Sequence, residues 1–226
     1  MKWNGLPIII IGTSGISKET KIIIDEINKL SYERMYDFLG FVAENSDDIG
    51  KEILNSKVVC SDKNFEEYIK EFKQIAVVIP IGTPKIKKRI FDKIKKYENI
   101  VFPNIISPSA KIMDYDNVKL GMGNVICSGS ILTTEIVIGD FNLININTTI
   151  GHNTVINNFC VINPTAAIAG NVTIEDEVLC GAGSSIKQGL NIGKRSIIGL
   201  GAFVVKDVEE DMTMVCSPAH NLRRGE

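Results

Sequence analysis

Residues 133–174 read TTEIVI GDFNLI NINTTI GHNTVI NNFCVI NPTAAI AGNVTI, and every block of six ends in isoleucine. The same apolar position, called a station below, recurs every six residues without a slip from Leu120 to Val204. Fifteen stations result, fourteen of them aliphatic and one Cys180. With 44% hydrophobic residues in the chain, chance would fill one register in this way on the order of once in 200,000 trials. The period of six is therefore a structural repeat.

A period of six fits extended strands and does not fit a helix. Six residues turn an α-helix through about 600°, which would scatter the stations over several faces. In a strand the side chains alternate, so every station stays on one side. Small or β-branched residues follow most stations four places later, as at Thr148, Thr154 and Ala166, and glycine or asparagine often comes directly after a station, where a sharp bend favours it. The pattern predicts a parallel β-helix with three hexads per coil, which makes a triangular prism.

The start of this solenoid is marked by a change of register. An earlier apolar set keeps the period of six but is offset by two residues from the stations: Ile100, Ile106, Ile112 and Val118. We interpret it as a linker followed by an irregular first coil, so the solenoid is expected to begin near residue 105. Residues 1–104 then form one domain. Residues 105–226 form a second domain, with a C-terminal cap over Asp207–Arg224 that closes the open end of the stack.

Residues 1–104 show a different pattern, in which buried strands alternate with amphipathic helices. An apolar strand at Ile8–Ile11 leads into the glycine turn Gly12–Ser17 and a helix over Lys18–Leu30. The other expected elements are a strand at Asp37–Val42, a helix at Asn64–Phe72, a strand at Ile75–Ile81, and a helix from Pro84 with Ile86, Ile90, Phe91, Ile94 and Tyr97 on one face. The alternation predicts a small Rossmann-like parallel α/β domain.

The glycine turn is a candidate phosphate site. The loop from Gly12 to Gly15 leads into a helix N-terminus, where free N–H groups and the helix dipole favour an anion. A full G-x-G-x-x-G is absent, and Glu44, the acid after the second strand, lies further on than the dinucleotide spacing of about 20 residues. A tight strand-to-helix turn alone also explains the glycines. A redox dinucleotide site is therefore not predicted.

Composition and charge exclude several classes of protein. With 25 basic and 27 acidic residues, the chain has no excess of positive charge for nucleic acid. Five scattered cysteines without a C-x-x-C pair are typical of reduced thiols in the cytoplasm. Only a short apolar run stands near the N-terminus, so neither a signal peptide nor a membrane span is predicted. A zinc hydratase on such a solenoid would need three histidine ligands, and the chain has only His152 and His220. We expect a cytoplasmic protein with no metal, membrane or nucleic-acid partner.

The order and size of the two domains resemble one family. It is the group of bacterial sugar acetyltransferases that includes the bacillosamine-pathway amino-sugar N-acetyltransferase and the sialic acid O-acetyltransferase. The resemblance covers nearly the whole chain, and its most specific segments are Gly12–Gly15, Gly40–Asn45, Ile81-Gly82, Gly151-His152, Ala169–Val172, Ile198–Ala202 and Ser217–Ala219. It implies a left-handed β-helix, acetyl-CoA as cosubstrate, and a homotrimer whose active sites lie between subunits.

The resemblance also implies binding residues in both domains. A nucleotide-linked sugar, UDP- or dTDP-linked, would contact the α/β domain through six residues: Ser14, Gly15, Ile16, Ala43, Glu44 and Gly82. Family members usually have two acids in place of Ala43-Glu44 and often a histidine in place of Ile16, which leaves the nucleotide open. Acetyl-CoA would lie along the solenoid at Gly170, Ala182 and Leu200. Val161 stands where the family has a second histidine that helps hold the acetyl donor.

His152 is the candidate general base. It follows station Ile150 by two places, which puts it at a corner of the prism and not among the inward positions. A solvated surface histidine is the competing interpretation. An imidazole titrates near neutral pH and can take a proton from an attacking amine or hydroxyl. The family usually places an acid directly after this histidine, whereas this chain has Asn153, which can accept a ring N–H but carries no charge. On this basis Asn153→Asp or Asn153→Glu is expected to raise turnover.

The leading hypothesis is an acetyl-CoA-dependent N-acetyltransferase acting on a nucleotide-linked amino sugar in cell-surface glycan biosynthesis, with His152 and Asn153 as its catalytic pair. One alternative is an O-acetyltransferase acting on a sugar hydroxyl such as that of a sialic acid, because the same base serves both acceptors. Another is a non-catalytic solenoid that binds a nucleotide sugar.

Overall fold

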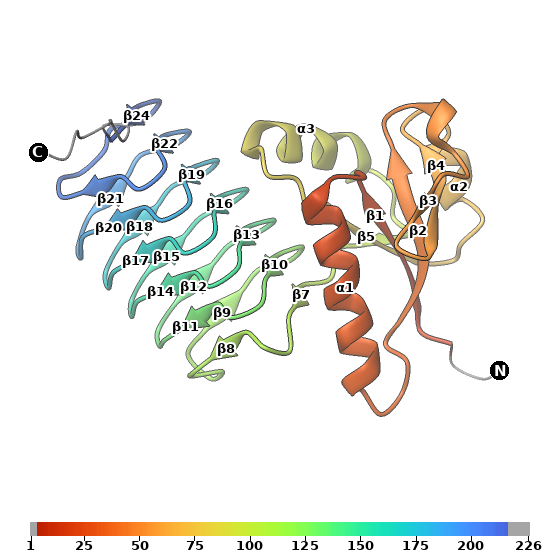
Figure 1. Ribbon diagram of the computed structural model, residues 1–226, viewed down its shortest axis with the longest axis horizontal. Coiled ribbons are helices and arrows are strands. Elements are labelled where there is room, and N and C mark those ends of the chain that lie inside the picture. Colours follow the sequence, from red (N-terminus) through yellow and green to blue (C-terminus); the bar gives the residue numbers. More distant parts are fainter. Residues whose placement is uncertain (1–3, 217–226) are drawn as a thin grey trace, which may run out of the picture.

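Two kinds of strand divide the molecule. The computed structural model describes residues 4–216, with an α/β domain followed by a stack of two-residue strands (Figure 1). The first domain contains a 3-10 turn at Ser46–Asp48 and nine further elements: β1 (Leu6–Ile11), α1 (Gly15–Leu30), β2 (Tyr36–Ala43), β3 (Glu52–Ile53), β4 (Ser56–Ser61), α2 (Phe65–Ile69), β5 (Ile75–Val78), α3 (Pro84–Ile94) and β6 (Ile100–Val101).

The six strands of this domain form one sheet in the order β3-β4-β2-β1-β5-β6. All neighbours run parallel except the short β3–β4 pair, which is antiparallel. In a parallel sheet the carboxyl ends of the strands share one edge, and the loops there are the usual ligand-binding region. The predicted Rossmann-like sheet is confirmed. The sequence interpretation missed β3, β4 and β6, although the alternation in β4 places Val58 and Cys60 in the core.

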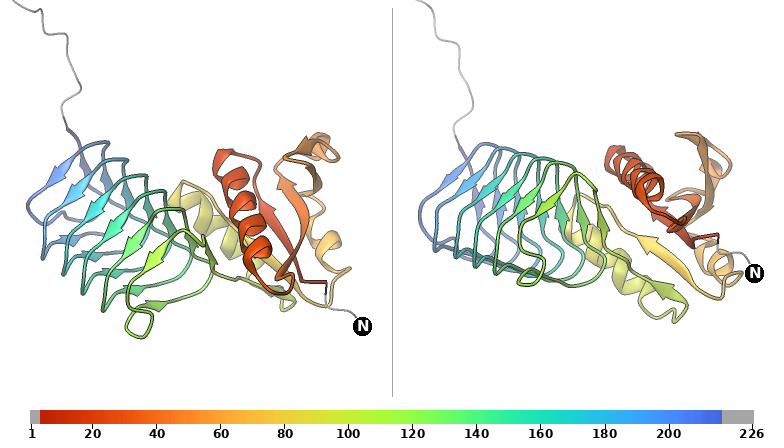
Figure 2. Two further views of the ribbon diagram at one scale, coloured as in Figure 1. Left: turned by 60° about the horizontal axis from the view of Figure 1, so that its bottom comes forward. Right: turned by 90° about the horizontal axis from the view of Figure 1, so that it is seen from below.

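The solenoid consists of three parallel sheets that form the sides of a prism (Figure 2). Sheet 1 contains β7 (Ile105–Ile106), β10 (Val125–Ile126), β13 (Leu143–Ile144), β16 (Val161–Ile162), β19 (Leu179–Cys180), β22 (Ile197–Ile198) and β24 (Thr213–Met214). Sheet 2 contains β8 (Lys111–Ile112), β11 (Ile131–Leu132), β14 (Thr149–Ile150), β17 (Ala167–Ile168), β20 (Ser185–Ile186) and β23 (Phe203–Val204). Sheet 3 contains β9 (Lys119–Leu120), β12 (Val137–Ile138), β15 (Val155–Ile156), β18 (Thr173–Ile174) and β21 (Asn191–Ile192).

Between β9 and β23 the paired strands are eighteen residues apart, as Leu143 is from Val161 and Ile144 from Ile162. The step is twenty residues at the first coil and sixteen at β24. One coil therefore contains three hexads, and the predicted left-handed β-helix is confirmed. Stations point inward and are almost fully buried. The small residues four places later are buried too, and most of their hydroxyls bond to backbone carbonyls: Thr154 donates to Ala169 O at 3.1 Å, whereas Ser184 Oγ has no partner within residues 4–216. Such bonds offset the cost of burying a polar group.

The corners between the sheets require an unusual backbone conformation. One column of corner residues, each eighteen after the last, has left-handed φ angles of 56° to 60°: Phe141, Phe159, Glu177 and Arg195. For residues other than glycine this conformation costs roughly 1 kcal/mol or more. The cost is tolerated because the next coil pairs with the corner backbone, as in the bond from Phe159 N to Asp140 O at 2.8 Å.

The α/β domain packs on the outer face of sheet 1. Outward positions of that sheet, including Val125, Leu143 and Val161, are fully buried in one apolar cluster with Ile23 and Ile24 of α1. Outward positions of sheets 2 and 3 are partly or fully exposed. Helix α3 runs along the corner between sheets 3 and 1, beside the phenylalanines of the left-handed column (Figure 1).

The packing of α3 differs from the face predicted for it. Ile86 is 39% exposed, whereas Lys87 is only 1% exposed, and its ammonium group donates to Phe141 O at 2.9 Å. The predicted face does hold Ile94 in the core. The difference arises because α3 is covered on two sides, by its own sheet and by the solenoid corner. A helix-period pattern alone identifies the first side only.

The first coil and the last strand complete the stack. Ile106 and Ile112 of the offset set lie on β7 and β8, and the first station, Leu120, follows eight residues after Ile112, so the first coil is irregular as expected. The sheet of the first domain ends at Val101, and β7 begins at Ile105. In the region of the expected cap, β24 pairs with β22, while residues 217–224 lie outside the described residues. Over residues 4–216 no helix is long and apolar enough to span a bilayer.

Candidate functional site

His152 stands on the corner between sheets 2 and 3, in the turn from β14 to β15. This corner, called the histidine corner below, is made of two columns of residues eighteen apart. The columns are Thr134, His152, Gly170 and Gln188, and beside them Glu135, Asn153, Asn171 and Gly189. The second column has left-handed φ angles of 53°, 57°, 55° and 78°. Backbone bonds tie the coils together, such as Asn171 N to His152 O at 2.8 Å.

The imidazole of His152 is exposed but held on two sides. Its Nδ1 lies 2.8 Å from Asn153 Oδ1, and Asn153 Nδ2 donates to Glu135 Oε2 at 2.7 Å. The ring also lies against Gly170, where an added Cβ would come within 2.6 Å of both Cε1 and Nε2. Only glycine leaves room for the ring in this position. Among the described residues no group hydrogen-bonds Nε2, so this nitrogen is open to a substrate.

The predicted nucleotide-binding residues gather at the carboxyl edge of the α/β sheet. Helix α1 begins at Gly15 and Ile16, and Ser14 precedes it as the N-cap. The turn before them contains Gly12, whose φ of 96° favours glycine. Ala43 ends β2 and is buried, with the exposed Glu44 after it. Gly82 lies in the loop after β5, before α3. Because the strands are parallel, these loops share one edge.

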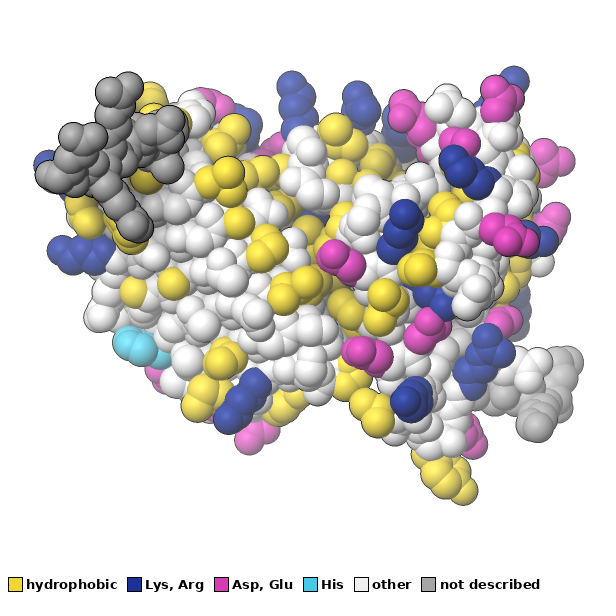
Figure 3. Space-filling model, viewed as in Figure 1, with side chains coloured by type: hydrophobic (Ala, Val, Ile, Leu, Met, Phe, Trp, Pro, Cys, Tyr) yellow, Lys and Arg dark blue, Asp and Glu magenta, His cyan; other side chains and the backbone are white. Residues whose placement is uncertain are grey.

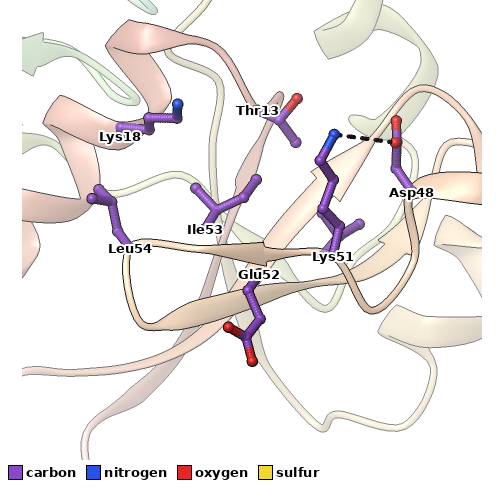
Figure 4. A pocket seen from close by; sticks show the side chains of 8 residues that line it. Thr13, Lys18, Asp48, Lys51, Glu52, Ile53 and Leu54 are labelled. Carbon is purple, nitrogen blue, oxygen red and sulfur yellow. Dashed lines mark ion pairs between the residues drawn. The ribbon is translucent and has the colours of Figure 1, made fainter.

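A cleft of about 320 Å³ adjoins the glycine turn (Figure 4). Thr13 and Lys18 line it from the turn and from α1, and Lys51 lines it from the loop before β3. The Lys51 ammonium pairs with Asp48 at 3.8 Å, and Glu52 points away from the two lysines (Figure 4). Two ammonium groups near a helix N-terminus suit an anion such as a diphosphate. The sequence interpretation missed both lysines, although Lys18 stands in the first turns of the helix that follows the glycine loop.

The residues expected to bind acetyl-CoA do not all come together. Gly170 is on the histidine corner, against the imidazole. Ala182 and Leu200 are eighteen residues apart and stack on the corner between sheets 1 and 2, where Gly201 N bonds to Ala182 O at 2.9 Å. Leu200 is 74% exposed. Both corners border sheet 2.

Val161 lies elsewhere, on the outward side of sheet 1, and is fully buried against the α/β domain. Its side chain is closed to a ligand in this chain, and packing against that domain accounts for it. Within the described part of the chain, no cluster of three or more histidine, cysteine, aspartate or glutamate side chains could hold a metal ion.

The two halves of the candidate site lie on different sides of the prism. The α/β domain, with the cleft at its glycine turn, packs on sheet 1. The histidine corner joins sheets 2 and 3, so it is the corner opposite sheet 1.

Comparison with known proteins agrees with this architecture. Residues 7–94 match the family model of the PglD N-terminal domain. No curated protein sequence matches the chain. WeeI from Acinetobacter baumannii AYE is 27% identical, with a TM-score of 0.81 over 96% of this chain and 100% of that one.

Two further solved structures are more distant in sequence but superpose as well. PerB from Caulobacter crescentus, in complex with CoA and GDP-perosamine, is 22% identical with a TM-score of 0.79 over 92% of each chain. The acetyltransferase domain of PglB from Neisseria gonorrhoeae, in complex with acetyl coenzyme A, is 20% identical with a TM-score of 0.81, over 92% of this chain and 95% of that one. Residues 7–94 thus match the PglD N-terminal domain, and the whole chain shares the fold of WeeI, PerB and the PglB acetyltransferase domain.

Proposed function

We propose that this protein is an acetyl-CoA-dependent acetyltransferase that acetylates the amino group of a nucleotide-linked amino sugar for glycan biosynthesis. The observation that carries the proposal is the exposed imidazole of His152, held by Asn153 and backed by Gly170. Support comes from the similar structures that contain CoA together with GDP-perosamine, or acetyl-CoA. An imidazole with one fixed nitrogen and one open nitrogen is suited to move a proton.

In the proposed reaction His152 acts as the general base through Nε2. The sugar amine attacks the thioester carbonyl, and Nε2 takes the proton that the nitrogen loses as the C–N bond forms. The C–S bond then breaks, and the departing thiolate receives that proton from the imidazolium. The products are the acetamido sugar and CoA, and the imidazole is neutral again. This role typically contributes about 10²–10⁴ in rate.

The nucleotide would bind at the carboxyl edge of the α/β sheet. Its diphosphate would meet the N–H groups at Ser14–Ile16, together with the Lys18 and Lys51 ammonium groups of the adjoining cleft. Ala43, Glu44 and Gly82 would lie around the rest of the nucleotide. The candidate nucleotides are UDP and dTDP, and the similar structure that contains GDP-perosamine adds GDP to them.

Acetyl-CoA would lie along sheet 2, between the two corners that carry Gly170 and Ala182. The outward positions next to His152 on this sheet are small and uncharged: Thr149, Ala167 and Ser185. They leave room for an uncharged pantetheine arm to run beside the imidazole. Leu200 at the far corner is exposed and available for apolar contact with the cosubstrate.

The active protein would be a homotrimer whose sites lie between chains. Outward strand positions of sheets 2 and 3 carry no charge beyond Lys111 and Lys119 of the first coil, and they include Val137 and Phe203, 42% and 77% exposed. In Figure 3 charged side chains crowd the α/β domain, while the solenoid surface in view carries few. Uncharged faces of this kind are typical of subunit contacts.

Thiol release from acetyl-CoA tests the proposed activity. The acceptors are UDP-, dTDP- and GDP-linked 4-amino sugars, nucleotide-linked 3-amino sugars, and free sialic acids. We expect release with a nucleotide-linked amino sugar and none with sialic acid. Release only with sialic acid would favour hydroxyl acetylation, and no release with any acceptor would favour a binding solenoid. Sedimentation of the purified protein at a trimer mass would support the shared site, and a monomer mass would contradict it.

A further inference from the structure

Glu135 lies one coil before Asn153, at the same place in the histidine corner. Both residues have left-handed backbones, with φ angles of 53° and 57°, so their side chains leave the corner one above the other. The Glu135 carboxylate accepts a hydrogen bond from Asn153 Nδ2 at 2.7 Å, and Asn153 Oδ1 lies 2.8 Å from His152 Nδ1. The three side chains thus form one chain of hydrogen bonds across two coils.

The acid sets the direction of every bond in this chain. An ionised carboxylate only accepts hydrogen bonds, so the NH₂ group of Asn153 must face Glu135. The amide oxygen of Asn153 then faces the ring. That oxygen also only accepts, so the proton of a neutral His152 must be on Nδ1. The lone pair of His152 is then on Nε2, which has no hydrogen-bond partner in the part of the chain that the structure describes. The Cε1–Nε2 end of the ring lies over Gly170.

We propose that Glu135 is a positioning residue for His152, which rests on the proposed role of His152 as base. Through Asn153 it holds the imidazole in the tautomer that a base at Nε2 requires. It also supplies a negative charge two hydrogen bonds away from the ring, which favours the imidazolium formed during the reaction. Asn153 by itself is uncharged and could turn its amide either way, so Glu135 provides what the neighbouring residue lacks.

The proposal changes the effect expected from a carboxylate at position 153. An aspartate in place of Asn153 would stand beside Glu135 with no proton between them, and two carboxylates at such a distance repel each other. The single change Asn153→Asp is therefore not expected to raise turnover, in contrast to the expectation from the sequence. Turnover should rise only when Glu135 is also neutralised.

Steady-state kinetics of the full-length protein with both substrates saturating tests the charge and the hydrogen bond separately. Glu135→Gln keeps an acceptor for the Asn153 amide but removes the charge, whereas Glu135→Ala removes both. We expect kcat to fall a few-fold in Glu135→Gln and about 10-fold or more in Glu135→Ala, with little change in the KM values. The matched control is Glu177→Gln, at a φ of 60° on another corner of the prism, which should leave kcat unchanged.

The tautomer of His152 gives a readout that does not depend on activity. Two-dimensional ¹H–¹⁵N spectra of the free protein above the titration range of the ring distinguish a proton on Nδ1 from one on Nε2, with His152→Ala providing the assignment. We expect Nδ1–H in the wild type and in Glu135→Gln. In Glu135→Ala we expect a shift toward Nε2–H, the form that free imidazole side chains prefer.

Each outcome decides a different point. A tautomer that does not change in Glu135→Ala would overturn the proposal, whatever happens to kcat. A changed tautomer with unchanged kcat would support the positioning role and contradict His152 as the base.

The double variant gives the sharpest kinetic test. We expect Glu135→Gln to lower kcat when position 153 is asparagine and to raise it in the Asn153→Asp background. The same sign of effect in both backgrounds would show that the two side chains do not act on the ring in series, and would also overturn the proposal.

Discussion

Two corners of the same prism have the same backbone conformation, but one is covered by a helix and the other is exposed. The corner between sheets 3 and 1 carries Phe141, Phe159 and Glu177 in left-handed conformations, and the histidine corner carries Glu135 and Asn153 in the same conformation. The first corner is covered by α3, whose Phe91 ring lies 4.4 Å from the ring of Phe141. The second is bare.

The contrast separates what the solenoid backbone determines from what its side chains determine. Both corners repeat every eighteen residues and are tied by the same coil-to-coil bonds. At one corner aromatic rings stack, Phe141 on Phe159 at 5.4 Å, and their apolar area binds a helix. At the histidine corner, hydrogen bonds align the side chains of Glu135, Asn153 and His152 and leave Nε2 of His152 without a partner among the described residues. A corner column can therefore become an interface or a reaction site without any change of fold.

The largest expected effect is the loss of activity when the imidazole at the histidine corner is removed. We expect His152→Ala to lower kcat by about 10²–10⁴, while the Kd of acetyl-CoA, measured by calorimetry, stays close to the wild-type value. His220→Ala is the matched control and should retain full activity. Turnover of His152→Ala within about tenfold of the wild type would exclude His152 as the base.

The contact between Gly170 and the ring can be broken from the other side. In Gly170→Ala the new Cβ would stand 2.6 Å from the imidazole, so the exposed ring must swing away. We expect kcat to fall by about 10²-fold, because small misplacements of a reacting group have effects of this size. Thermal stability should change little, since only the end of an exposed side chain moves.

A combined variant shows whether the methyl group acts through the ring. In the His152→Ala background, Gly170→Ala should cause no further loss of kcat. A further loss, or a weaker Kd for acetyl-CoA, would mean that Gly170 acts on the cosubstrate directly.

At the covered corner the sharpest test is Lys87. Its ammonium group is buried against Phe141 O and Cys160 O, and burial lowers the pKa of Lys87 to about 7. The unfolded chain keeps this proton up to a pH of about 10.5. Above pH 7 the folded state therefore binds fewer protons than the unfolded state, and the free energy of unfolding rises with pH by up to about 1.4 kcal/mol per unit. Below pH 7 Lys87 is protonated in both states, so the free energy of unfolding no longer depends on pH through this residue.

Urea unfolding of the wild type and Lys87→Met between pH 7 and 8.5 measures this contribution. The window stops there because the cysteines of the unfolded chain begin to ionise near pH 8.5. We expect the wild type to gain stability relative to Lys87→Met as the pH rises. A difference between the two proteins that does not depend on pH would show that Lys87 keeps its charge when the protein is folded.

The smallest effect is expected at the ion pair on the same corner. Lys88 on α3 and Glu177 on the solenoid are 2.8 Å apart, but the lysine side chain is 40% exposed and its attraction is screened by solvent. Glu177→Gln should lower the free energy of unfolding by no more than about 1 kcal/mol. A loss well above this value would indicate that the pair, and not the apolar contacts, holds α3 on its corner.

The solenoid could be predicted almost completely from the sequence, because one short-range signal specifies it. The stations define the inward face, and the bend residues define the corners, so His152 could be placed on a corner in advance. The α/β domain was predictable where strands are apolar runs. It was not where strands are short and partly exposed, as at β3 and β6.

The parts of the site that were missed depend on contacts between coils or between domains. Glu135 belongs to no local motif with His152, and only a step of eighteen residues from Asn153 reveals it. Lys51 enters the cleft from the loop before β3, and Lys87 looks like an ordinary charged residue of a basic helix. Their roles follow from which surfaces meet, and a periodic pattern in one segment does not contain that information.

The coil length of eighteen residues limits how such a protein can change in length. Six residues inserted or deleted between Glu135 and His152 would carry the histidine to a different side of the prism and away from its partners, although the hydrophobic interior would stay intact. A whole coil added there would keep the histidine on the same corner of the prism, but a residue of the added coil would take the place of Glu135 next to Asn153. Homologues that differ in length before His152 should therefore differ by complete coils, and those with an asparagine directly after the histidine should carry an acid one coil before that asparagine.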